Sequence, residues 1–169
     1  MCIVASVTGM RLGEILALQP CNVHEKYLDV KYNMSPTDGL KSTKSKKPRM
    51  VPINHALYRT LKAWFPKNPE GYIFSMKGDV PYTPSTVSAS LKARCEKLGI
   101  KGKTFHSFRA YFDSIMMARN INETTLRKVI GHKDAKMTEH YLHLDATEFD
   151  IITDAQNEIG GKYFIDKSE

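Results

Sequence analysis

The stretch 104–119 constrains the fold most, because its apolar residues recur at the spacing of an α-helix. The residues that share one face of that helix are Phe105, Phe108, Phe112 and Ile115. A stripe with three aromatic rings is stable only when other elements cover it. The stretch therefore predicts a helix packed into a hydrophobic core, in a fold made largely of helices.

Further helical patterns occur along the chain, most of them bounded by capping residues, glycine or proline. We expect helices over Cys2–Val7, Arg11–Leu18, Asn54–Phe65, Pro84–Leu98, Asn122–Ile130, Lys136–His143 and Ala146–Glu158. The first of these is apolar from its start and has no cap before it. We therefore expect the sequence to begin inside a helix and to lack an upstream segment.

Two segments are typical of strands instead. Tyr27–Asn33 and Arg49–Asn54 are rich in residues that favour strands, and the segment between them, Met34–Pro48, is rich in Ser, Thr, Gly and Lys. This pattern predicts a hairpin with a long polar tip, and Tyr72–Ser75 predicts a further short strand. The expected fold class is α+β: mainly α, with a small antiparallel β-sheet.

Charge is distributed unevenly over the 169 residues. Residues 1–143 hold 23 of the 25 basic and 11 of the 18 acidic side chains, a formal charge of +12, whereas residues 144–169 carry −5. A body this basic favours a polyanionic partner, most often nucleic acid. No apolar run approaches the roughly 18 residues of a membrane span, and three scattered cysteines suit a reducing cytoplasm.

Four short motifs carry reactive side chains. Arg11 and Glu14 are three residues apart on one helical face, and so are His106 and Arg109 in His-Ser-Phe-Arg. The segment from Lys41 to Arg49 has five positive charges and no acid. The fourth motif is Gly131-His132, followed nine positions after the histidine by Tyr141. Each motif alone is common in proteins, but their joint occurrence in this order is not.

Together these motifs resemble the catalytic domain of the tyrosine recombinases, the phage integrase family. The matching residues, in chain order, are Arg11, Lys44, His106, Arg109, His132 and Tyr141. The resemblance covers about Ile3–His143. It implies the DNA breaking-rejoining fold, with a catalytic domain over residues 1–143, an acidic C-terminal helix or tail over 144–169, and no core-binding domain.

The chemistry of these side chains suits phosphoryl transfer to a hydroxyl. Arg11 and Arg109 are expected to bind the nonbridging phosphate oxygens, and His132 to donate a further hydrogen bond. Tyr141 is the expected nucleophile, and His106 would accept or orient its proton. By resemblance the product is a 3′-phosphotyrosyl intermediate, which is then rejoined to another strand without metal, ATP or any other cofactor. Glu14 is expected to hold neighbouring backbone or arginines.

The lysine-rich tip is expected to serve both catalysis and DNA binding. Lys44 lies eight positions before Pro52, which fits the family's general-acid lysine better than Lys41 or Lys46 does. The residues expected to contact DNA are Lys41, Lys46, Lys47 and Arg49.

The resemblance also implies partners. They are double-stranded DNA and, for a full-length protein, three further copies in a homotetramer on DNA. The expected location is the cytoplasm, in association with the nucleoid, and the expected gene is bacterial or phage-encoded and belongs to a mobile genetic element. The helix Ala146–Glu158 either docks on a neighbouring copy or folds back on its own domain. Two alternative functions are a type IB topoisomerase-like enzyme and a DNA-binding relative without catalysis; the intact residue set favours a site-specific recombinase that carries out DNA recombination and integration.

Overall fold

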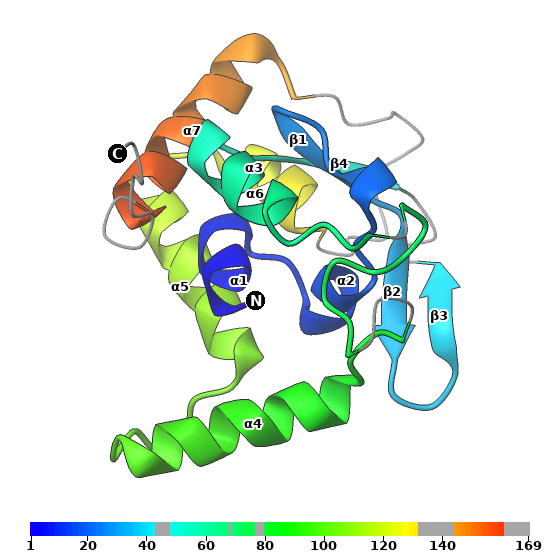
Figure 1. The fold of residues 1–169 in the computed structure, drawn as a ribbon. Helices are drawn as coiled ribbons and strands as arrows, with labels where there is room; N and C mark the ends of the chain where they lie inside the picture. The colour runs from blue at the N-terminus through cyan, green and yellow to red at the C-terminus, as the bar shows by residue number, and fades with distance from the viewer. Residues whose placement is uncertain (43–47, 68, 77–79, 132–143, 161–169) are drawn as a thin grey trace, which may run out of the picture.

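The aromatic helix does pack into the core, as the computed structural model shows (Figure 1). The structure describes residues 1–42, 48–67, 69–76, 80–131 and 144–160. Helix α5 (Phe105–Ala118) contacts α1 (Cys2–Thr8), α6 (Glu123–Ile130) and α7 (Ala146–Gly160). Phe112 is fully buried between them, and Phe105 is nearly so. The predicted stripe is therefore confirmed.

The other helices begin where capping residues predict. Helix α2 (Leu12–Leu16) follows Arg11, and a 3₁₀ turn spans Pro20–Asn22. Helix α3 (His55–Lys62) is capped by the Asn54 side chain, which accepts a hydrogen bond from the Leu57 amide at 2.9 Å. Helix α4 (Pro84–Lys97) starts after Thr83 and exposes most of its side chains. The expected helix Lys136–His143 lies outside the described residues.

The strands differ from the expected single hairpin. Tyr27–Asn33 is divided into β1 (Tyr27–Val30) and the start of β2 (Tyr32–Ser35), and part of the expected tip forms β3 (Gly39–Ser42). Strand β1 pairs antiparallel with β4 (Arg49–Pro52), while β2 pairs antiparallel with β3.

The prediction that Met34–Pro48 is only a loop is therefore wrong. Asp38-Gly39 is the physical reason, because Gly39 adopts a φ of 66° and lets the chain turn back into a strand. The strand predicted over Tyr72–Ser75 is also wrong. It is reduced to an isolated bridge between Ser75 and Pro81, whose missing N–H limits any ladder there.

Helix α7 folds back on its own domain. It packs against α1, α3, α5 and β4, and its inner face buries Ile152, Ala155 and Ile159. Gln156 is fully buried and bonds both the Asn54 amide, at 2.9 Å, and the Pro52 carbonyl, at 2.7 Å. Of the two expected positions for this helix, the structure has the intramolecular one. Among the described residues, no helix combines the length and apolar character needed to cross a bilayer.

Candidate functional site

The turn between α1 and α2 positions the first arginine. Helix α1 ends at Thr8 and is capped by Gly9, which has a φ of 63°. An added Cβ at Gly9 would lie 2.6 Å from the Phe112 ring. Two residues later, the amide of Arg11 donates to Glu14 Oε2 at 2.9 Å, and Nη1 of Arg11 donates to Glu14 Oε1 at 3.1 Å. The three-residue spacing thus brings these side chains together as expected. The Arg11 side chain is 37% exposed.

Glu14 is the buried centre of this cluster. Its side chain is only 2% exposed, yet it stays charged because Arg49 donates to both of its oxygens, at 3.0 and 2.7 Å. Burial raises the pKa of Glu14, but the hydrogen bonds and charges of Arg49 and then Arg11 outweigh burial and leave the pKa below its ordinary value. Glu14 therefore holds two arginines, as the sequence predicts.

Arg109 reaches the same region from α5. It is 3% exposed, and its two Nη atoms donate to the carbonyls of Gly9, at 2.6 Å, and Ile130, at 2.7 Å. Burial and then the nearby charge of Arg11 lower the pKa of Arg109 to about 10. The guanidinium therefore remains protonated at neutral pH.

Three arginines share the C-terminal end of α6, which is next to Gly131-His132 in the sequence. Arg49 Nε donates to the Val129 carbonyl at 2.8 Å, and Arg109 Nη2 to the next carbonyl, as described above. Arg11 Nη2 donates to the Gly131 carbonyl at 3.2 Å. Cations suit this position because the last carbonyls of a helix carry partial negative charge and have no partners within the helix.

The remaining expected site residues divide into two groups. His106 is exposed in the first turn of α5, and Lys41 is exposed on β3. Lys41 forms an ion pair with Asp38 at 2.6 Å, and this contact is the main reason that the pKa of Asp38 falls to about 2. The expected residues that lie outside the described part of the chain are Lys44, Lys46, Lys47, His132 and Tyr141.

Arg49 lies in a different position from the one we expected. We expected it to contact DNA with the tip lysines, but its side chain is only 11% exposed and bonds Glu14 and Val129. A signal was available in the sequence. Arg49 precedes Val51 by two residues in a strand, so both side chains lie on one face, and Val51 is fully buried.

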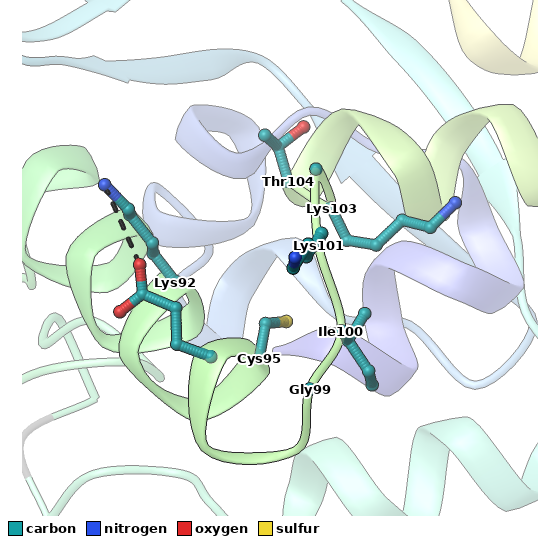
Figure 2. A pocket seen from close by; sticks show the side chains of 9 residues that line it. Lys92, Cys95, Gly99, Ile100, Lys101, Lys103 and Thr104 are labelled. Atoms are coloured by element: carbon teal, nitrogen blue, oxygen red, sulfur yellow. Dashed lines mark ion pairs between the residues drawn. The ribbon is translucent and has the colours of Figure 1, made fainter.

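A separate hollow lies beside the segment that leads into α5 (Figure 2). It measures about 500 Å³ and lies between the C-terminal half of α4 and residues 99–104. Lys101 and Lys103 are exposed along it, and Lys92 is ion-paired with Glu96 at 3.9 Å. None of the clustered arginines lines this hollow. Within the described part of the chain, no group of His, Cys, Asp or Glu side chains is arranged to hold a metal ion.

This helical domain, with its small antiparallel sheet, has the fold of the tyrosine recombinase catalytic domains. The integrase of the transposon Tn1549, solved with circular intermediate DNA, superposes with a TM-score of 0.68 at 17% identity, over 87% of this chain and 55% of that one. A XerA recombinase superposes with a TM-score of 0.57 at 22% identity, over 95% of this chain and 55% of that one.

The chain belongs to the phage integrase family, whose model matches residues 1–148. It is 31% identical over 152 residues to the tyrosine recombinase XerA of Saccharolobus solfataricus, covering 89% of this chain and 45% of that protein. It is 30% identical to the integrase of Staphylococcus phage L54a, covering 83% of this chain and 46% of that protein. The chain thus spans about half the length of these curated relatives.

Proposed function

We propose that this chain is the catalytic part of a site-specific DNA recombinase, a DNA strand transferase that uses a tyrosine nucleophile. The observation that carries the proposal is the meeting of Arg11, Arg49 and Arg109 at one place. Among the residues that the structure describes, the carboxylates of Glu14 and Asp113 partly offset the charge of Arg109, whereas Arg11 and Arg49 add to the positive charge, so three guanidiniums face two carboxylates. A phosphodiester is an anion that this excess suits, and its charge builds up on the nonbridging oxygens as a nucleophile attacks.

The two arginines of the family motif have donors for that phosphate. A guanidinium carries five N–H groups, and the contacts described above use two in Arg11 and two in Arg109. Both groups are held by bonds to backbone, so little reorganisation accompanies the reaction. Arg11, the more exposed of the two, would meet the phosphate first.

In the proposed reaction the Tyr141 oxygen attacks the phosphorus and the bond to the 5′ oxygen breaks. Tyr141 loses its proton to a base, for which His106 is the candidate, and Lys44 gives a proton to the departing 5′ oxygen. His132 donates a hydrogen bond to the phosphate. A 5′-hydroxyl from another strand then attacks the 3′-phosphotyrosyl bond and releases Tyr141. The covalent bond preserves the energy of the phosphodiester, so the exchange needs no ATP.

The proposed partners are double-stranded DNA and further copies of the protein. Solved relatives include an integrase in complex with transposon DNA and the XerH recombinase bound to its difH substrate. Lys41, Lys46 and Lys47 are the proposed backbone contacts. A homotetramer on DNA and a location in the cytoplasm, beside the nucleoid, belong to the same proposal.

A trapping experiment tests the function. The chain is incubated with a labelled pool of duplexes of random sequence, each of which carries a nick. Cleavage close to the nick releases a short fragment that carries the new 5′-hydroxyl. This fragment diffuses away, so the strand cannot be rejoined. We expect a covalent adduct that maps to Tyr141 by mass spectrometry and disappears in Tyr141→Phe. The matched control is Tyr111→Phe, which alters an exposed tyrosine of α5 and should leave the adduct unchanged. No adduct from any duplex, or one that survives Tyr141→Phe, would contradict the proposal.

A further inference from the structure

Arg49 links three parts of the cluster that are distant in sequence. It begins β4, directly after the lysine-rich tip, and bonds Glu14 of α2 and Val129 of α6. We propose that Arg49 is a positioning residue for strand cleavage: it sets the orientation of Glu14, and thereby of Arg11, and it ties β4 to the end of α6. The inference rests on the proposed function, which supplies the reaction that these groups serve.

The guanidinium of Arg49 is committed to these contacts. Its two Nη atoms each donate to a different oxygen of Glu14, in the paired geometry that makes arginine–carboxylate contacts directional. Its Nε donates to the Val129 carbonyl at 2.8 Å. Three bonds in one plane leave the group little freedom to turn outward. A side chain held in this way is poorly placed to contact DNA.

Arg11 depends on Arg49 through the shared carboxylate. Oxygen Oε1 of Glu14 accepts from both Nη1 of Arg49 and Nη1 of Arg11, and Oε2 accepts from Nη2 of Arg49 and the Arg11 amide. Two bonds from Arg49 therefore set the plane of the carboxylate. Without them the carboxylate turns more freely, and the guanidinium of Arg11 loses its fixed partner.

The Arg49 side chain also packs closely against the C-terminal end of α6. An added Cβ at Gly131 would lie 3.1 Å from Cζ, Nε and Nη1 of Arg49. A side chain at Gly131 would therefore require the Arg49 guanidinium to shift from the position in which it bonds the Val129 carbonyl. Arg49 therefore ties the start of β4 to the end of α6, and Gly131 is the residue that precedes the motif histidine His132 in the sequence.

The test separates positioning from DNA binding. Arg49→Met removes all three hydrogen bonds. Arg49→Lys keeps the positive charge, but the compact ammonium group cannot bond both Glu14 and the Val129 carbonyl at the same time. We expect the rate of adduct formation at saturating DNA to fall about 100-fold in Arg49→Met and about 10-fold in Arg49→Lys, as a displaced catalytic group would cause. We expect the Kd for DNA to stay within about 3-fold of the wild-type value, with an unchanged salt dependence.

Two control variants define the alternatives. Lys41→Met removes an exposed charge from strand β3, which pairs with β2. It should weaken DNA binding and reduce by about 1 the slope of the logarithm of the binding constant against the logarithm of the salt concentration. Leu57→Ala creates a cavity in the core and controls for lost stability; its rate at saturating DNA should match the wild type. If Arg49→Met behaves like Lys41→Met, or cleaves at the wild-type rate, the inference is overturned.

A measurement without DNA makes the inference independent of the adduct assay. The Arg11 amide is bonded to Glu14, so its hydrogen exchange reports the orientation of that carboxylate. We expect faster exchange at Arg11 in Arg49→Met, intermediate exchange in Arg49→Lys and wild-type exchange in Leu57→Ala. Unchanged exchange in both Arg49 variants would overturn the inference. An absent wild-type adduct would instead refute the proposed function.

Discussion

Replacing Glu14 by glutamine is the sharpest test of the arginine cluster, because it changes charge while preserving shape. The carboxylate accepts four hydrogen bonds, two from Arg11 and two from Arg49. In Glu14→Gln one of the two oxygens becomes an NH₂ group, which cannot accept a bond from a guanidinium. At least two of the four donors therefore lose their acceptor, and the buried charge of Arg49 loses its counter-ion.

The contacts set the expected magnitude. Removing one partner of a buried ion pair costs about 3–5 kcal/mol, because the remaining charge is left without compensation. For a chain of this size each kcal/mol shifts Tm by roughly 2–4 °C, so we expect Glu14→Gln to unfold about 6–20 °C lower. The matched control is Glu96→Gln. The ion pair of Glu96 with Lys92 is exposed, and such pairs contribute only about 0.3–0.5 kcal/mol.

The pH dependence gives a second readout with a definite sign. The pKa of Glu14 in the folded protein lies below its ordinary value of 4.5, so the unfolded chain binds the proton more readily. The stability that this carboxylate contributes is fully present above about pH 4.5 and is lost as the pH falls through the folded pKa. The pKa of Glu148 is also lowered, but Glu148 is present in both proteins and cancels in the comparison.

The assay is thermal or urea unfolding followed by circular dichroism. The wild type, Glu14→Gln and Glu96→Gln are compared at several pH values between about 3 and 7, because carboxylates titrate in this range. The difference in stability between wild type and Glu14→Gln should be largest near neutral pH and shrink in acid. The reasoning is refuted if Glu14→Gln melts within about 2 °C of the wild type, or if the difference is the same at every pH.

Two further substitutions probe the elements that hold the cluster in place. Gly9→Ala should destabilise the protein by about 2–5 kcal/mol in urea unfolding, because a left-handed φ and a Cβ 2.6 Å from the Phe112 ring both oppose alanine there. The control Gly99→Ala has a similar φ but open space around it, so it should cost only about 1–2 kcal/mol. Equal costs for the two substitutions would contradict the prediction. Gln156→Ala should cost about 1–3 kcal/mol by the same measurement, because the Pro52 carbonyl of β4 and the Asn54 amide at the start of α3 lose buried hydrogen bonds. An unchanged unfolding midpoint would show that α7 contributes little there.

Local patterns in the sequence predicted most of the helices correctly. The apolar stripe of α5 and the caps at Asn54 and Asn122 depend on residues within a few positions of one another. The strands were harder to predict, because their partners are chosen over longer distances. β1 and β2 are separated by a single residue, Lys31, yet they pair with different strands. Nothing near Lys31 in the sequence indicates that change of partner.

The candidate site divides in the same way. The order and spacing of the motifs predicted the family and named Arg11 and Arg109 as site candidates. The three-residue spacing also predicted the contact of Arg11, at the N-cap of α2, with Glu14 in its first turn, because such contacts depend on local geometry. The alternation of β4 places Arg49 on the same face as Val51, but only the tertiary structure shows which groups Arg49 bonds. Its partners, Glu14 and Val129, lie 35 and 80 positions away in the sequence. The lysines before Arg49 indicate a surface charge, and only the fold shows that Arg49 bonds groups of α2 and α6. Burial then decides the outcome, because a guanidinium removed from water has to find its acceptors within the protein.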